Sequence, residues 1–118
     1  MVERKDRTEG TPLSGFILSE QARDDVAEIS DFLEDNADEA VARRFVDSFA
    51  EACRLLAEKP GIGCPRPGLG LGIRVHLLGS YVILYRDTPD LIVVVRVLHE
   101  RRDISRIFGV HEDEERDR

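Results

Sequence analysis

The chain of 118 residues is poor in several residue types, and each scarcity excludes a class of protein. It contains no tryptophan, one methionine and only two cysteines, Cys53 and Cys64. Two cysteines are too few for a disulfide-rich secreted scaffold, and their spacing is not that of a metal site. We therefore expect two reduced thiols in a cytoplasmic protein that holds no metal and no cofactor.

Long apolar runs are also missing. No run approaches the roughly 18 residues that a membrane span requires, and the N-terminus lacks the apolar core of a signal peptide. The length predicts a single domain with one hydrophobic core. Residues 1–13 and 109–118 are polar without periodicity, so we expect them to be disordered and residues 14–108 to form the domain.

Excess positive charge is absent as well, because the net charge is −7. This balance argues against a generic nucleic-acid-binding protein. The charge is unevenly distributed: residues 20–58 contain twelve acids and four arginines, a balance of −8, whereas residues 59–110 contain eight bases and four acids, a balance of +4. An anionic partner is therefore expected to meet the second half of the chain.

The acidic half has the pattern of two helices. Ser19 is a suitable N-cap for the first helix, and Asn36 can cap a second one with Glu39 in the capping-box position. Pro60-Gly61 then ends the second helix. The link between the helices is so short that they must form an antiparallel hairpin. Apolar residues of the first helix recur at helical spacing: Ala22, Val26, Ile29 and Leu33.

The second half has the pattern of an antiparallel meander. Three apolar runs between Ile73 and His99 are separated by Gly79-Ser80 and by residues 87–90, two connections of hairpin length. Phe16-Ile17-Leu18 could add a short edge strand before the first helix. The predicted fold is α+β, with an N-terminal helical hairpin packed on an antiparallel sheet of three to four strands.

Alternation along these strands divides their side chains between two faces. A two-residue turn pairs Leu78 with Tyr81, and a four-residue loop pairs Tyr85 with Ile92 and Tyr81 with Arg96. We expect the helices to cover the aliphatic face, which holds Ile73, Val75, Leu77, Val82, Leu84, Leu91, Val93, Val95 and Val97. We expect the other face to bind a partner, because cations and phenols lie there among apolar residues: Arg74, His76, Tyr81, Tyr85 and Arg96. A register slip of one residue would exchange the two faces.

The order of these elements, and four segments within them, resemble a known family. The segments are ILSEQARDDVAEISDFL, PRPGLGLGIR, GSYVILYR and RVLHERRDI, and with the elements between them they cover about residues 16–108. They are similar to the ParE branch of the RelE/ParE toxin superfamily of bacterial type II toxin–antitoxin systems. The resemblance implies a toxin that is neutralised by a ParD-like antitoxin in a hetero-oligomer and that contacts DNA only through this antitoxin. It also implies DNA gyrase as the target, and the partner face as the antitoxin-binding surface.

The RelE branch of the superfamily supplies the alternative, a ribosome-dependent mRNA endoribonuclease. Its chemistry needs a base, an acid and a cation for the phosphorane charge. The candidates for these roles are Arg74, Arg96, His99 and Tyr81. No tyrosine follows Arg102 in the last segment of the domain, and His111 lies in the acidic tail, so we favour inhibition by protein binding. A third reading is a degenerate member that binds only its antitoxin.

Overall fold

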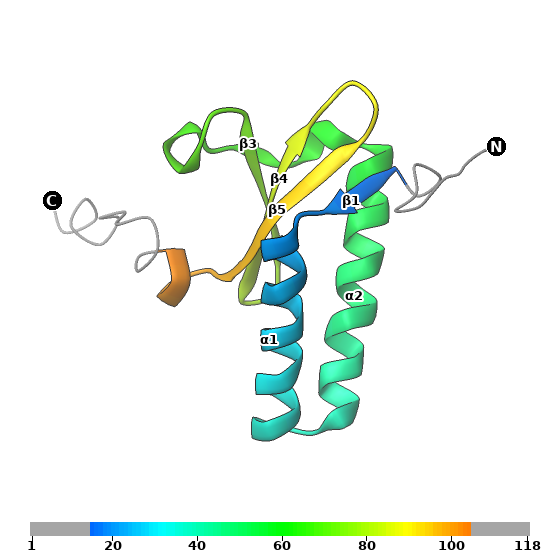
Figure 1. Ribbon diagram of the computed structural model, residues 1–118, viewed down its shortest axis with the longest axis vertical. Helices are drawn as coiled ribbons and strands as arrows, with labels where there is room; N and C mark the ends of the chain where they lie inside the picture. Colours follow the sequence, from blue (N-terminus) through cyan, green and yellow to red (C-terminus); the bar gives the residue numbers. More distant parts are fainter. Residues whose placement is uncertain (1–14, 105–118) are drawn as a thin grey trace, which may run out of the picture.

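The structure, a computed structural model, describes residues 15–104 (Figure 1). The helices and strands are β1 (Phe16–Leu18), α1 (Glu20–Asn36), α2 (Glu39–Glu58), β2 (Cys64–Pro65), β3 (Ile73–Leu78), β4 (Tyr81–Asp87) and β5 (Ile92–His99). Two 3₁₀ turns, η1 (Pro60–Ile62) and η2 (Pro67–Leu69), flank β2. Within this part of the chain no helix is both long enough and apolar enough to span a membrane. The predictions for residues 1–13 and 109–118, and for His111, lie outside the described residues.

The sheet has five strands in the order β1-β5-β4-β3-β2. The predicted arrangement of a helical hairpin on a sheet is confirmed, with the difference that the sheet is mixed, because β1 runs parallel to β5. Parallel neighbours need a long crossover connection, which the helical hairpin and the meander supply here. The sheet also contains β2, which was not predicted; it is only two residues long and pairs with β3 at the edge of the sheet.

The helices begin where short polar side chains accept their first backbone N–H groups. Ser19 caps α1 as predicted, and its Oγ accepts a hydrogen bond from the Ala22 N–H at 3.0 Å. The predicted cap of the second helix is wrong: Asn36 is the last residue of α1, and Asp38 caps α2 by accepting the Val41 N–H at 2.9 Å. Because α1 extends through Asn36, the first non-helical residue with a suitable side chain is Asp38.

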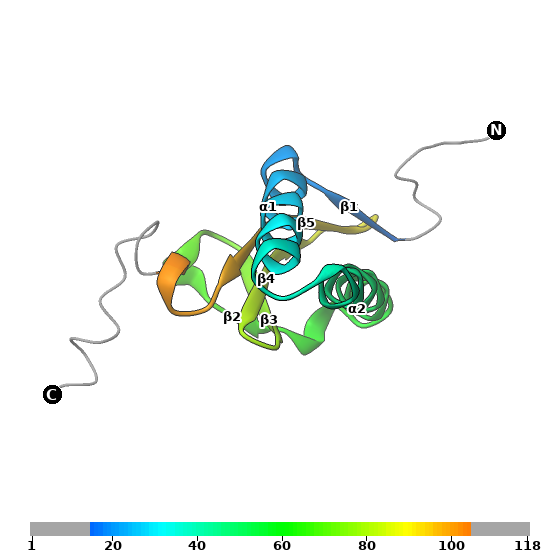
Figure 2. The ribbon, with the colours of Figure 1, turned by 90° about the horizontal axis from the view of Figure 1, so that it is seen from below.

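The two helices lie side by side on one face of the sheet (Figure 2). The predicted choice of face is wrong, because the helices cover the face that carries Tyr85. The buried residues of this core from both layers are Ala22, Ile29, Phe49, Ala52, Cys53, Leu56, Ile83, Tyr85, Ile92, Val94 and Val97. Both sheet faces are apolar, so hydropathy alone did not distinguish the face that the helices bury.

The strand register explains part of this reversal. The pairing of Leu78 with Tyr81 across the Gly79-Ser80 turn is confirmed. Between β4 and β5, however, Tyr85 pairs with Val94 and Tyr81 pairs with His99, so the predicted pairs are wrong. The four-residue loop lies one residue further along the chain than expected, between Asp87 and Ile92, and this shifts the pairing by two residues. A bulge then places one additional residue in β5 opposite Leu84 and Tyr85. The bulge rotates Val97 onto the helix-covered face.

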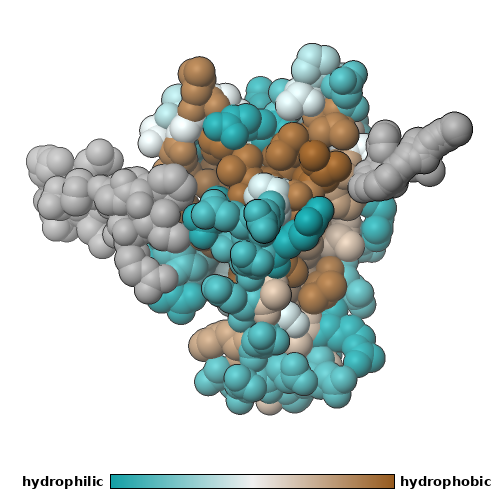
Figure 3. Space-filling model, viewed as in Figure 1, coloured by the Kyte–Doolittle hydropathy of each residue, from teal (hydrophilic) through white to brown (hydrophobic). Residues whose placement is uncertain are grey.

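The sheet face turned away from the helices, called the open face below, has a much thinner cover. Its buried residues form a second, smaller cluster: Leu69, Ile73, Val75, Val82, Leu84, Leu98 and Ile104. Among residues 15–104 no helix of more than one turn lies over it. Figure 3 shows apolar side chains at the surface around β1 and β5, whereas the surface of the two helices is mostly hydrophilic.

Candidate functional site

The start of α1 lies along the edge of β5 beyond the point where β1 ends. The Ser19 N–H donates to the Val94 carbonyl at 2.9 Å, and the Ser19 hydroxyl donates to the Val95 carbonyl at 2.8 Å. Further along, the Asp25 carboxylate accepts the Val97 N–H at 2.9 Å. Ser19 and Asp25 therefore continue the backbone pairing of β5 where β1 stops.

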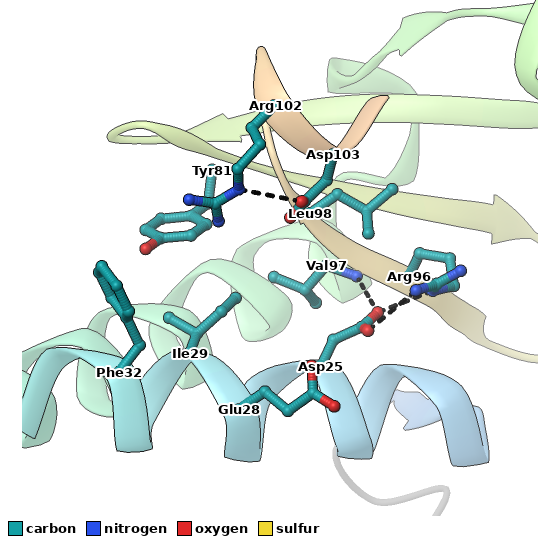
Figure 4. A pocket seen from close by; sticks show the side chains of 10 residues that line it. All are labelled: Asp25, Glu28, Ile29, Phe32, Tyr81, Arg96, Val97, Leu98, Arg102 and Asp103. Carbon is teal, nitrogen blue, oxygen red and sulfur yellow. Dashed lines mark hydrogen bonds and ion pairs between the residues drawn. The ribbon is translucent and has the colours of Figure 1, made fainter. Parts of the chain in front are cut away.

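Asp25 also holds Arg96 through two parallel hydrogen bonds (Figure 4). The Arg96 Nε lies 2.8 Å from Asp25 Oδ2, and one Nη lies 3.0 Å from Oδ1. The side chains are 19% and 11% exposed respectively, so this bidentate pair is largely shielded from water. The hydrogen bond to Asp25 raises the pKa of Arg96 above its usual value, although burial opposes the shift. Arg96, one of the cations expected on the face that binds a partner, is thus paired with an acid of its own chain.

A groove of about 470 Å³ opens beside this pair, between α1 and the end of β5. Figure 4 shows Phe32 and Tyr81 near one end of it and the Asp25–Arg96 pair near the other, with Arg102 above Tyr81. We call this feature the α1 groove. Its lining residues are Asp25, Glu28, Ile29, Phe32, Tyr81, Arg96, Val97, Leu98, Arg102 and Asp103.

The apolar end of the groove rests on a row of rings. The Tyr81 ring lies 5.3 Å from the Phe45 ring in a tilted arrangement and 5.5 Å from the His99 ring, edge to face. Such geometries are favourable for aromatic pairs. Phe32 is 49% exposed and lines the groove together with Tyr81. The Phe32–Tyr81 end of the groove is thus an apolar surface with a rigid base.

His99 orders the turn that carries Arg102. Its Nδ1 accepts hydrogen bonds from the Arg101 and Arg102 N–H groups, and its own backbone N–H donates to Asp103. An Nδ1 that accepts must be unprotonated, so the proton of the neutral ring lies on Nε2. Within the described part of the chain His99 is therefore engaged in structural hydrogen bonds.

The structure separates the five residues predicted to bind the antitoxin. Tyr81 and Arg96 line the α1 groove. Tyr85 is fully buried under the helices, where its hydroxyl donates to the Pro60 carbonyl at 2.6 Å and accepts the Gly63 N–H at 3.0 Å. Burial is the main cause that raises the pKa of Tyr85 above its usual value. Tyr85 is thus committed to the fold.

Arg74 is held at the same loop, and His76 lies elsewhere on β3. The Arg74 guanidinium donates to the Gly63 carbonyl at 2.7 Å and more weakly to the Gly61 carbonyl at 3.3 Å. His76 is half-buried and pairs with Ile83. Of the four candidates for nuclease chemistry, Tyr81 and Arg96 line the same groove and His99 contacts the Tyr81 ring, whereas Arg74 lies apart from them at the loop after α2.

Sequence reasoning missed three important groove residues, and for one of them a signal existed. Asp25 lies three residues after Ala22 and four before Ile29, on the buried stripe of α1. An acid on such a stripe is a sign of a buried charge that needs a partner. Phe32 and Arg102 gave no comparable signal, because single exposed residues of either type are common.

Metal ligands and reactive cysteines were also considered as candidate sites. Among residues 15–104 no group of three His, Cys, Asp or Glu side chains could hold a metal ion. Both cysteines are free, with Cys53 buried and Cys64 exposed. Burial raises the pKa of Cys53 to about 12, so this thiol stays protonated at neutral pH.

Comparison with known families gives the context of this geometry. Residues 16–104 match the family model of the ParE toxin of type II toxin–antitoxin systems, parDE. The chain belongs to this family. The resemblance of the sequence to the ParE branch is therefore confirmed, and the matched segment covers almost all of the described residues of this ParE-family chain.

Individual ParE relatives agree with this assignment. The chain is 33% identical over 94 residues to Toxin ParE1 of two Mycobacterium tuberculosis strains, an alignment that covers 79% of this chain and 96% of the relative. It is 30% identical over 94 residues to Toxin ParE1 of Caulobacter vibrioides, covering 80% and 97%. Its fold is similar to a solved structure of the chromosomal ParDE TA system from P. aeruginosa, with a TM-score of 0.64 and 19% identity over 75% of this chain and 98% of the solved one.

Proposed function

We propose that this ParE-family toxin binds a ParD-like antitoxin through the α1 groove and that, when free, it acts on DNA gyrase in the cytoplasm. The observation that carries the antitoxin proposal is the exposed apolar end formed by Phe32 and Tyr81 on a rigid base of rings. Well-packed aromatic residues at the centre of a surface are typical anchors of protein interfaces.

The charges of the groove do not attract a partner of one particular sign, but one of them is placed to make a specific polar contact. The lining contains the acids Asp25, Glu28 and Asp103 and two arginines, so the net charge of the groove does not favour an acidic partner. Asp25 already neutralises Arg96. Arg102 is 54% exposed, although its Nε donates to Asp103, and it is the cation best placed to meet a partner carbonyl or carboxylate. We therefore propose an apolar anchor between the Phe32 and Tyr81 rings and a polar contact at Arg102.

The proposal keeps two of the five predicted antitoxin-binding residues, Tyr81 and Arg96, as groove residues. Arg74 and Tyr85 act on the antitoxin only indirectly in this view, through the loop after α2 that they hold. His76, which lies within β3 outside the groove, remains a candidate for contact with the antitoxin.

Binding to the antitoxin encoded beside this gene tests the groove directly, by calorimetry with purified proteins. Phe32→Ala should weaken binding about tenfold or more, because loss of an interface anchor costs roughly 2 kcal/mol. Leu55→Ala is the matched control, since Leu55 is similarly exposed but lies on α2 outside the groove. Arg102→Ala should weaken binding more than Arg101→Ala. Unchanged affinity in both Phe32→Ala and Arg102→Ala would refute the groove as the antitoxin site.

The gyrase part of the proposal is supported by the way the nuclease candidates are occupied. A working RNA-cleaving site needs its cation, acid and base to converge on one phosphate. Here Arg96 is paired with Asp25, and Arg74 donates to carbonyls of a different loop. The His99 Nδ1 is engaged by two amides. These commitments favour a toxin that acts by binding a protein.

Two parallel assays separate the two targets. Purified toxin should inhibit gyrase supercoiling, and the antitoxin should restore it, while a ribosome-plus-mRNA reaction should show no cleavage. Codon-phased cuts that disappear in the Arg74→Ala, Arg96→Ala double variant, with gyrase unaffected, would replace the gyrase proposal with the endoribonuclease.

A further inference from the structure

Leu71 is the most exposed large apolar side chain within residues 15–104, at 88%. It lies in the loop of residues 67–72, which we call the Leu71 loop and which leads into β3 (Figure 1). Its neighbours Gly70 and Gly72 have positive φ values of 145° and 75°. A Cβ on Gly70 would also lie 3.0 Å from the Ile73 side chain. The backbone that presents Leu71 to solvent therefore requires glycine on both sides of it.

The Leu71 loop is held in place from within and from below. The Gly70 N–H donates to the Pro67 carbonyl, and the Ile73 N–H donates to the Gly70 carbonyl, both at 3.1 Å. Leu69 is buried in the cluster of the open face and anchors the loop there. A side chain on an ordered loop loses little conformational freedom when it binds. Leu71 is thus prepared to enter an apolar pocket of a partner.

Arg86 places a cation beside this leucine. Its Nε donates to the Leu71 carbonyl at 3.1 Å, and the residue is exposed. In the described part of the chain Arg86 is paired with no acid. Asp87 follows it in β4, but alternation places Asp87 on the opposite face of the sheet, the side of Tyr85. The Nη groups of Arg86 can therefore receive a carboxylate from a partner.

The chain around the Leu71 loop is uniformly basic. Residues 59–86 contain four bases and no acid, whereas the whole chain has a net charge of −7. In the α1 groove, by contrast, Arg96 is paired with Asp25 and Arg102 with Asp103. The anionic partner expected for the basic half of the chain is therefore matched at the Leu71 loop and not in the groove.

The Leu71 loop and the α1 groove lie at opposite ends of β4. Tyr81 lines the groove, and Arg86 follows it by five residues, about 17 Å at roughly 3.3 Å per residue. Because five is an odd number, the two side chains also point to opposite faces of the sheet. The two surfaces can therefore contact different proteins.

We propose that the free toxin contacts its target through the Leu71 loop, with Leu71 in an apolar pocket and a carboxylate of the target on the Arg86 guanidinium. This inference rests on the proposed action on DNA gyrase. It gives the contacted part of that target a defined chemistry, an acidic protein surface with an apolar hollow. It also separates the target surface from the antitoxin site in position and in charge.

Inhibition of gyrase supercoiling by purified toxin tests the leucine, with calorimetry of antitoxin binding as a second readout. Leu71→Ser should raise the toxin concentration for half-inhibition about tenfold or more, because burial of a leucine side chain is lost. Leu71→Met should keep most of the inhibition. Leu55→Ser is the matched control, since Leu55 is exposed on α2. Unchanged antitoxin binding shows that each variant is folded.

The same two assays test the cation. Arg86→Glu should weaken gyrase inhibition more than Arg86→Gln, because it places an acid opposite the carboxylate of the target. Arg54→Glu, an exposed charge reversal on α2, should leave inhibition unchanged. Antitoxin binding should be the same for all three variants and the wild type.

The outcomes separate this proposal from the choice of gyrase as target. Inhibition by the wild type that Leu71→Ser and Arg86→Glu leave unchanged would overturn the Leu71 loop and keep gyrase. Absence of inhibition by the wild type would overturn gyrase and this proposal together. Weaker antitoxin binding in Leu71→Ser would assign the loop to the antitoxin, and a lower molecular mass of this variant in sedimentation would assign it to a second copy of the toxin. Either result would also overturn the proposal.

Discussion

The Asp25 carboxylate and the Arg96 guanidinium are joined by two hydrogen bonds, of 2.8 and 3.0 Å, at the edge of β5. The same carboxylate accepts the Val97 N–H, so one side chain satisfies both a strand backbone and a cation. The bulge in β5 precedes this point, and it sets the register in which Val97 faces the helices. Together with Ser19, Asp25 therefore fixes α1, and with it one wall of the α1 groove, against β5.

Replacing this acid should destabilise the fold more than replacing its exposed neighbour. Asp25→Ala leaves Arg96 and the Val97 N–H unpaired in a shielded position, and we expect a loss of roughly 3 kcal/mol in the free energy of unfolding. Asp25→Asn should lose less, because its amide oxygen can still accept the Val97 N–H. Urea unfolding measures both values. Asp24→Ala is the control, expected to change stability by less than about 0.5 kcal/mol. Equal losses for Asp24→Ala and Asp25→Ala would contradict the role of the pair.

Tyr85 should be important for its hydroxyl as well as its ring. Tyr85→Phe keeps the buried ring but removes the partner of the Pro60 carbonyl and the Gly63 N–H. We expect a loss of about 1–3 kcal/mol in the free energy of unfolding. Tyr81→Phe is the matched control, since no hydrogen bond of the Tyr81 hydroxyl is found among residues 15–104. A cost for Tyr81→Phe as large as that for Tyr85→Phe would refute the loop contact.

The position facing that hydroxyl accepts only glycine. A Cβ on Gly63 would collide with the Tyr85 hydroxyl and ring, whereas a Cβ on Gly61 would meet no atom within 4 Å. Gly63→Ala should therefore lower the midpoint of thermal unfolding clearly, and Gly61→Ala should have little effect. Similar midpoints for the two variants would show that the loop relaxes at little cost.

The two cysteines should react at very different rates. Cys64 is exposed, whereas Cys53 is buried with a pKa of about 12. A maleimide or disulfide reagent should titrate one thiol per native chain and two per chain in denaturant, and Cys64→Ser should leave no rapidly reacting thiol. Two fast thiols in the native protein would mean that the core around Cys53 opens readily.

Because the Cys53 thiol is buried, the free energy of unfolding should depend on pH in the alkaline range. The folded state keeps the Cys53 thiol protonated, while the unfolded chain ionises it near its usual pKa of 9.0. Stability is therefore fully present below pH 9 and declines as the pH rises from 9 towards 12. The decline should be smaller in Cys53→Ala, measured as the difference in unfolding free energy between two pH values within this range. An unchanged decline would assign the effect to other groups, such as Tyr85.

Features that are determined by a few neighbouring residues could be predicted from the sequence, whereas features that depend on distant contacts could not. The β3–β4 hairpin was predicted correctly, because Gly79 adopts a positive φ of 63° in a two-residue turn that permits one register. The β5 register was not, because its loop is closed by Thr88 and Leu91 and the bulge has no distinct sequence signature. One added residue exchanges the faces of a strand.

The choice of sheet face failed for a related reason. The prediction treated tyrosine and arginine as signs of a surface that binds another chain. In the fold, Tyr85 and Arg74 instead reach the backbone of the Pro60–Gly63 loop, and the helices can close over them because their polar atoms are satisfied. Long polar side chains with apolar stems are compatible with either surface. Only the loop geometry, which the sequence does not specify locally, decides between them.

The pairing of β1 with β5 also has a consequence in time. Phe16 lies beside Ile92, 76 residues later in the chain. At a synthesis rate of roughly 5–20 residues per second, the partner strand follows about 4–15 s after the first one has been made. Until then neither Ser19 nor Asp25 has its counterpart, and the helical hairpin has only part of its sheet to cover. A translation product that stops before β5 therefore lacks both the complete sheet and one wall of the α1 groove, so the groove forms only late in synthesis.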